Sequence, residues 1–233
     1  GPQPPAALAA IERRAAEIGA PLYLHGRDWH VGAAGGGLAY RGRDGERTLP
    51  APNLLGAHQI DNAGIALACA ELLDDFALDD GARRAGLARA RWPARLQHLR
   101  VGPLPARLPD GWELWLDGGH NAAAGAALAQ VAAGWHDRPL HLVYGMLNTK
   151  AAEDFLAPLA PHVAALRAVA IPGEPASLTA EQAAAHARGV GIPVQVSGNV
   201  GEAVESLIDA APAGRILICG SLYLAGRVLA GNG

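Results

Sequence analysis

Three groups of polar side chains each follow directly after an apolar segment of the chain. Asp117, His120 and Asn121 follow "WELWL", residues 148–150 follow "LVYGM", and Ser221 follows "ILICG". In open α/β sheets, ligands bind beyond the carboxyl ends of the strands, where loops and helix N-termini meet. Gly118 and Gly119 would let the backbone approach a ligand closely. We therefore predict a binding cleft at this edge of the sheet.

The same residue types also have purely structural uses. Asp and Asn after a strand often form turns or cap the next helix, and Asn121 is placed to cap the helix that it opens. Asp117 and His120 could act as general acid and base, but no nucleophile follows them and no GxSxG motif is present. For any one of these loops, a structural role and a role in ligand binding are equally good interpretations. Because all three loops are expected at one edge of the sheet, ligand binding is favoured.

Two further positions suit a nucleotide. His58 and Asn62 lie four residues apart in an expected helix and so share one face. One histidine and one amide do not make a zinc site, whereas an amide can pair with an adenine edge. Arg95 follows Trp92 and Pro93 at an expected domain boundary, where a guanidinium could hold a phosphate. Taken alone, His58 and Asn62 would be the solvated side of an amphipathic helix, and Arg95 would be a surface arginine.

Composition limits the class of protein. Half of the 233 residues are hydrophobic and the net charge is −3, without a basic cluster, so we expect a folded globular protein that does not bind nucleic acid. The two cysteines, Cys69 and Cys219, lie in apolar runs and are expected to be buried thiols. No apolar stretch would span a membrane and no signal peptide is recognisable, so the expected location is cytoplasmic.

Residues 92–233 alternate between apolar strands and helices, which predicts an α/β, Rossmann-like domain with a mostly parallel sheet. The expected strands are "WELWLD", "PLHLVYGM", "ALRAVAI", "IPVQV" and "GRILICG", and the expected helices cover 121–135, 151–160, 179–189, 199–210 and 221–230.

Residues 1–91 follow a different pattern. Helices are expected at 4–18, 54–76 and 79–90, and short strands in "PLYLHG", "DWHVGAAGGGLAY" and "ERTLP". No helix follows the three glycines at 35–37, so they predict a hairpin turn and not a phosphate-binding loop. No sheet core is evident in this part.

Five motifs, in this order, resemble the folate branch of the Mur ligase superfamily, the bifunctional dihydrofolate synthases/folylpolyglutamate synthases. They are "LLGAHQIDNAGIALACAELL", "RWPARLQ", "LWLDGGHNAAAG", "VYGMLNTK" and "GSLYLAG". The resemblance implies that residues 1–91 are the remnant of a P-loop ATPase central domain, and that residues 92–233 are the C-terminal glutamate ligase domain.

The resemblance also implies roles for individual residues. Asn62 corresponds to the adenine contact, Arg95 to the arginine on the ATP phosphates, and Asp117 to the nucleotide-binding aspartate. His120 corresponds to the histidine beside ATP and glutamate, and it is implied to be catalytic.

Three more residues belong to the implied site. Ser221 and Asn121 are expected on the glutamate side, together with His120. Lys150 is implied as a catalytic residue that faces an anion. Family members often carry an aspartate after this lysine, whereas here Ala151 follows it.

The implied reaction ligates L-glutamate to dihydropteroate, or to the glutamate tail of a folate such as tetrahydrofolate, through an acyl phosphate made with ATP and Mg²⁺. Lys150 is the only lysine and no GxxxxGK[ST] motif exists, so the P-loop and the magnesium ligands are expected upstream of Gly1. We therefore expect the chain alone to be inactive. The resemblance also implies that its enzyme is a monomer. The alternatives are a peptidoglycan-precursor ligase, against which "WPARLQ" argues, and a non-catalytic α/β module that binds anions or nucleotides.

Overall fold

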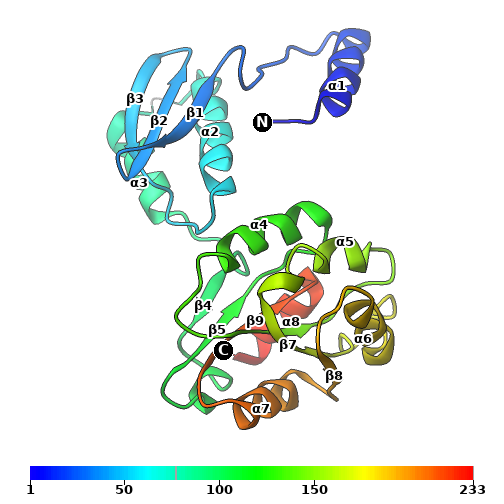
Figure 1. Cartoon of the computed structure of the whole chain (residues 1–233). Coiled ribbons are helices and arrows are strands. Elements are labelled where there is room, and N and C mark those ends of the chain that lie inside the picture. The colour runs from blue at the N-terminus through cyan, green and yellow to red at the C-terminus, as the bar shows by residue number, and fades with distance from the viewer. Residues whose placement is uncertain (77, 233) are drawn as a thin grey trace. The chain divides into compact units, whose positions relative to one another are not determined.

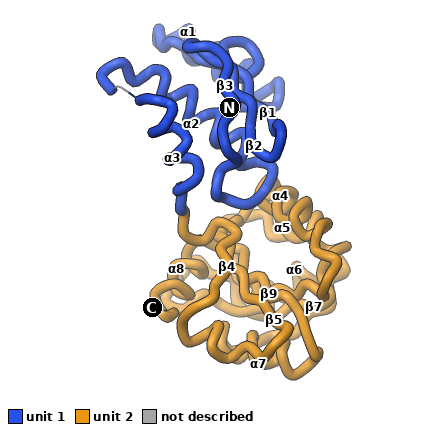
Figure 2. Tube along the Cα trace, turned by 90° about the vertical axis from the view of Figure 1, so that its left-hand side faces the viewer, with its two compact units in different colours: residues 1–91 blue, residues 92–233 orange. Residues whose placement is uncertain are grey.

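The computed structural model describes residues 1–76 and 78–232. The chain divides into two compact units, Gly1–Arg91 and Trp92–Gly233, coloured separately in Figure 2. Each unit has its own hydrophobic core.

Unit 1 contains a three-stranded antiparallel sheet in the order β1-β2-β3. Its strands are β1 (His30–Ala34), β2 (Gly37–Gly42) and β3 (Gly45–Pro50). Gly35 and Gly36 join the first two strands with φ of 56° and 79°, the left-handed pair that a two-residue hairpin turn requires. The hairpin predicted from these glycines is therefore confirmed.

Three helices complete unit 1: α1 (Pro5–Ile18), α2 (His58–Glu71) and α3 (Asp80–Arg89). Gly19 ends α1 in the left-handed conformation, and the Asp79 side chain caps α3 by accepting from the Ala82 amide. The second helix is shorter at both ends than the predicted 54–76. Cys69 lies exposed on this helix, so the expectation that its thiol is buried is wrong. "PLYLHG" forms no strand and contributes only an isolated bridge between His25 and Trp29.

The expectation that this part lacks a core is wrong. A cluster of buried side chains joins the sheet to α2 and α3, and it consists of Trp29, Leu38, Tyr40, Leu49, Ala63, Leu67, Ala68 and Leu87. The alternation in β2, which buries Leu38 and Tyr40 but leaves Ala39 exposed, supplies one side of this cluster.

Unit 2 is built on a six-stranded sheet in the order β4-β5-β9-β6-β7-β8 (Figure 1). The strands are β4 (Gln97–Leu99), β5 (Trp112–Leu116), β6 (Leu140–Tyr144), β7 (Val163–Ala168), β8 (Val194–Val196) and β9 (Gly214–Cys219). All neighbouring strands are parallel except β4 and β5. The predicted mostly parallel α/β fold is confirmed.

Helices cover both faces of this sheet. They are α4 (Ala122–Ala132), α5 (Ala152–Leu156), α6 (Ala180–Gly189), α7 (Val200–Ala210) and α8 (Leu222–Asn232), with 3-10 turns η1 (Pro105–Arg107) and η2 (Ala160–His162). Leu142 and Tyr144 of β6 pack with α4, α5 and α6, whereas Val143 packs with α7 and α8. Burial on both faces explains why the strands are almost uniformly apolar.

Two elements of unit 2 differ from the prediction. The helix predicted at 151–160 ends at Leu156, and η2 follows it after a turn. The short antiparallel strand β4 was not predicted, because three residues that include Gln97 and His98 give neither an apolar run nor a clear alternation.

No helix within residues 1–76 and 78–232 has the length and apolar character that crossing a membrane demands.

His141 of β6 is a buried polar residue under α7 and α8. Its ring stacks on Trp112, with 5.5 Å between the ring centroids, and among the described residues neither ring nitrogen has a hydrogen-bond partner. Burial, and to a lesser degree the charge of Arg167, lowers the pKa of His141 below its ordinary value of 6.5.

The buried His141 makes the folded state sensitive to acid. The unfolded chain takes up a proton below about pH 6.5 while the folded ring resists it, so His141 destabilises the fold progressively as pH falls through that value. We expect His141→Phe to raise the free energy of unfolding by about 1 kcal/mol or more near pH 7 and to flatten its decline toward pH 5. Chemical denaturation across this pH range measures both effects. His162→Phe, at an exposed ring, is the control, and equal slopes for all three proteins would contradict the prediction.

Candidate functional site in unit 2

The three polar loops lie at one edge of the sheet of unit 2. Strands β5, β9 and β6 are adjacent and parallel, so the segments that follow them leave the sheet at the same edge. Backbone hydrogen bonds connect the segments, from Gly220 N to Gly119 O and from Gly145 N to Cys219 O. The structure thus brings together the loops that carry Asp117, Ser221 and Lys150.

Asp117 links two segments that are distant in the sequence. Its Oδ1 accepts a hydrogen bond from Gly119 N at 2.6 Å, and its Oδ2 accepts one from Leu96 N at 2.8 Å. The side chain is buried, with 8% of the residue's surface exposed. Charge-assisted hydrogen bonds of this kind are stronger than those between neutral groups. Asp117 therefore ties the turn after β5 to the turn before β4.

The turn before β4 has an unusual backbone. Ala94 and Leu96 have φ of 54° and 44°, and they are the non-glycine residues with positive φ among those described. Each such residue costs about 1–2 kcal/mol. Ala94 is buried in the core on one face of the sheet and Leu96 in the core on the other. Arg95 is therefore held at the rim of the sheet between two buried neighbours.

The Arg95 side chain is half-buried over the glycine turn that follows Asp117. Its Nη1 donates to Ala94 O at 3.3 Å, and the same carbonyl accepts from Gly118 N at 2.9 Å. A Cβ on Gly118 would overlap Leu222 and lie 3.3 Å from Arg95 Nη1. A side chain at position 118 would therefore require the end of the Leu222 side chain to move and would crowd the guanidinium.

His120 has one ring nitrogen committed to the backbone. Its Nδ1 lies 3.0 Å from Gly118 O. A carbonyl oxygen only accepts, so Nδ1 carries the hydrogen and Nε2 of a neutral ring is an acceptor. The half-buried ring can therefore present Nε2 to a donor such as an ammonium group.

Asn121 and Ser221 both cap helices. Asn121 Oδ1 accepts from Ala124 N at the start of α4, and Ser221 Oγ accepts from Tyr223 N at the start of α8. Asn121 is exposed, whereas only 2% of the surface of Ser221 is. Their contact with a substrate stays a prediction.

Lys150 is exposed in the loop after β6. Its amide donates to Leu147 O, and the loop is fixed to the segment after β7 by a hydrogen bond from Asn148 N to Ala176 O at 2.8 Å. An isolated bridge pairs Leu147 with Ser177 as well. The loop therefore presents the ammonium group from an ordered backbone.

Asn62 belongs to unit 1 and lies exposed on α2. Its Nδ2 donates to Gln59 Oε1 at 3.0 Å, and Gln59 Nε2 lies 2.9 Å from His58 Nε2. The predicted pair His58 and Asn62 is thus connected through Gln59, a residue that the motif analysis did not single out.

Gln97 is the residue of this site that sequence reasoning missed. Its Oε1 accepts from Ala94 N at 3.0 Å and so closes the strained turn. The motif "RWPARLQ" contains it, but the motif was interpreted only for Arg95. The sequence did offer one indication, since the amide side chain of Gln97 follows Arg95 by only two residues.

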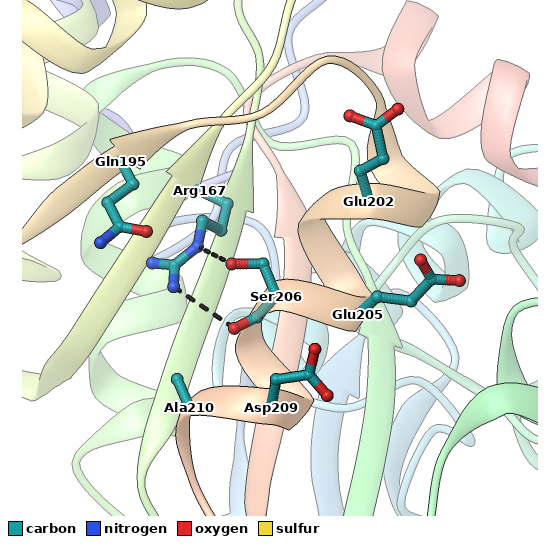
Figure 3. Close-up of a pocket in the computed structure, with 7 residues that line it drawn as sticks. All are labelled: Arg167, Gln195, Glu202, Glu205, Ser206, Asp209 and Ala210. Atoms are coloured by element: carbon teal, nitrogen blue, oxygen red, sulfur yellow. Dashed lines mark hydrogen bonds between the residues drawn. The ribbon is translucent and has the colours of Figure 1, made fainter.

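Within the described residues, no group of three or more His, Cys, Asp or Glu side chains is arranged to hold a metal ion. A shallow groove between β8 and α7 is lined by Arg167, Gln195, Glu202, Glu205, Ser206, Asp209 and Ala210 (Figure 3). Arg167 is buried there and donates to Ser206 Oγ at 2.9 Å and, through Nη2, to Ser206 O. None of the predicted site residues lines this groove.

Comparison with known proteins identifies the class. The family model described as "Mur ligase, glutamate ligase domain" matches residues 104–222, just over half of the chain. The chain therefore belongs to the Mur ligase family, as the sequence motifs predicted.

Its relatives are folate enzymes. A Halobacterium salinarum protein named "Probable bifunctional folylpolyglutamate synthase/dihydropteroate synthase" is 32% identical over 85% of the chain. The Mycobacterium tuberculosis folylpolyglutamate synthase complexed with ADP and AMPPCP is 29% identical over the whole chain, with a TM-score of 0.81. A bifunctional folylpolyglutamate synthase/dihydrofolate synthase with Mn, AMPPNP and L-glutamate bound is 28% identical over 95% of the chain, with a TM-score of 0.78.

The chain spans only part of these proteins. It covers 22% of the Halobacterium protein, 55% of the Mycobacterium chain and 50% of the third.

Asp117→Asn tests the tie between the two turns. An asparagine keeps one acceptor oxygen but turns an NH₂ group toward the second amide, so a buried donor loses its partner. We expect a loss of about 1–3 kcal/mol in the free energy of unfolding of unit 2. Urea denaturation followed by tryptophan fluorescence measures it. Asp110→Asn, at an exposed aspartate, is the matched control, and a loss no larger than that of the control would contradict the structural role of Asp117.

Proposed function

We propose that this chain is part of an ATP-dependent ligase that joins L-glutamate to dihydropteroate and to the glutamate tail of folates. Membership of the Mur ligase family and relatives named for folylpolyglutamate and dihydrofolate synthesis support the proposal. The observation that carries it for this molecule is the hydrogen-bonded Ala94–Leu96 turn, which places Arg95 beside the glycine turn after Asp117.

The reaction has two steps. An oxygen of the acceptor carboxylate attacks the γ-phosphorus of ATP, which forms an acyl phosphate and releases ADP. The glutamate amine then attacks the acyl carbon and releases phosphate. Because negative charge must be stabilised on the transferring phosphoryl group, a fixed cation at its oxygens lowers the barrier.

Arg95 is the residue that we assign to the phosphates. The guanidinium is restrained by the hydrogen bond from its Nη1 to Ala94 O, and a phosphate can accept two of its N–H groups. Asp117 and Asn62 are assigned to the nucleotide, the latter to its adenine. In this assignment the Asp117 carboxylate contacts the nucleotide while it also accepts hydrogen bonds from two backbone amides.

His120, Asn121 and Ser221 are assigned to the glutamate side. With Nδ1–H donated to Gly118 O, His120 can accept a hydrogen bond from the incoming ammonium group at Nε2 and take up its proton. Lys150 supplies an ammonium charge from the neighbouring loop, where an anionic oxygen of the substrate would be stabilised.

ATP chemistry of this kind also uses Mg²⁺, as the Mn ion in the solved relative suggests. The described residues offer no cluster that suits such an ion, and no role for it is assigned to them.

Arg95→Ala should weaken ATP binding by about ten- to a hundredfold, which corresponds to the loss of a charge-assisted hydrogen-bond pair. Isothermal titration of the chain with ATP measures the change, and Arg95→Lys should recover only part of it because an ammonium cannot bind two oxygens in parallel. Arg100→Ala is the matched control, since Arg100 is exposed and belongs to the same segment.

Equal ATP affinities for the Arg95→Ala variant and the unsubstituted chain would overturn the assignment of Arg95. The same variants in the protein that carries this chain, assayed with dihydropteroate, ATP and L-glutamate, test the proposed reaction itself.

A further inference from the structure

The backbone of the Arg95 turn is held at three points. Ala94 O accepts from Gly118 N, Leu96 N donates to Asp117 Oδ2, and Ala94 N donates to Gln97 Oε1. The first two contacts come from the segment after β5. The third comes from β4, which directly follows the turn, so Gln97 alone holds its first amide.

Gln97 is itself fixed by the sheet. It is the first residue of β4 and pairs with Leu116, the last residue of β5 and the neighbour of Asp117. Its side chain is half-buried, and its Oε1 lies 3.0 Å from Ala94 N. Because Ala94 N–H is a donor, the acceptor must be the amide oxygen.

This contact has a direct consequence for Arg95. Ala94 has a positive φ, which a non-glycine residue leaves readily for an extended or helical conformation unless the surroundings hold it. Rotation at Ala94 would move the Cα of Arg95 away from the glycine turn. The hydrogen bond from Ala94 N to Gln97 Oε1 opposes this rotation, because the rotation would separate the two atoms.

We infer that Gln97 is a positioning residue for Arg95. It acts through the backbone of Ala94 and keeps the guanidinium beside the Gly118 turn. The inference rests on the proposed function only in that the oriented guanidinium is taken to bind the phosphates of ATP; the restraint on the turn stands apart from any ligand.

Gln97→Met tests the restraint, because methionine keeps the length of the side chain and removes the acceptor. Amide hydrogen exchange followed by NMR should show faster exchange at Ala94 N–H, by about three- to tenfold, as expected for the loss of one hydrogen bond. Gln97→Glu, which keeps an acceptor oxygen, should restore slow exchange. Gln195→Met on β8 is the matched control for the substitution itself. An unchanged exchange rate at Ala94 in a folded Gln97→Met chain overturns the inference.

ATP titration tests the link to Arg95. Gln97→Met should weaken ATP binding by about three- to tenfold, and Gln97→Glu should largely restore it. In an Arg95→Ala background, Gln97→Met should cause no further loss, because a residue that acts through Arg95 has nothing left to position. Losses that simply multiply in the double variant overturn the positioning role and indicate a general structural effect.

The two measurements separate two kinds of failure. If Arg95→Ala leaves ATP affinity unchanged, the proposed phosphate contact fails, and the exchange rate at Ala94 decides the restraint alone. If Arg95→Ala weakens ATP binding and Gln97→Met speeds exchange without affecting affinity, the proposed function stands and the positioning role is wrong.

Discussion

The carboxylate of Asp117 accepts backbone hydrogen bonds from Leu96 and Gly119, and the geometry of the candidate site depends on this pair of contacts. A buried carboxylate needs strong donors, and the two backbone amides are donors of this kind. Together with the hydrogen bond from Gly118 N to Ala94 O, the contact with Leu96 joins the turn before β4 to the turn after β5. The cost of positive φ at Ala94 and Leu96 is sustained because burial on both faces of the sheet and these hydrogen bonds oppose any relaxation.

The parallel sheet determines what lies next to this unit. Since β9 and β6 run beside β5 in the same direction, the loops with Ser221 and Lys150 emerge at the edge where Asp117 ends its strand. Glycines allow the close approach: Gly118 leaves space for Leu222 and Arg95, and Gly220, with φ of 106°, lies against the carbonyl of Gly145. Polar groups from three loops thus lie at one edge of the sheet, outside the hydrophobic core.

Much of this arrangement could be predicted from the sequence, for identifiable reasons. The alternation of apolar strands with helices predicted the parallel sheet, and parallel direction alone places the three loops together. The positive φ of Ala94 and Leu96 could not be predicted, because neither residue is a glycine and tertiary contacts impose the conformation. Strand β4 and the contact of Gln97 were missed for a related reason: a short edge strand and a side-chain-to-backbone hydrogen bond leave no periodic pattern. For Asn121, the cap and the ligand contact were both open from residue type, and the structure establishes the cap.

We propose that nucleotide binds unit 2 at the rim formed by the turns of Arg95 and Asp117. NMR chemical-shift mapping of the labelled chain during titration with ATP tests it most directly. We expect the largest amide shifts within 94–96 and 117–120, with little change at the opposite strand ends near Leu140 and Gly214. Shifts concentrated at those opposite ends, or along the groove of Arg167 and Ser206, would contradict it.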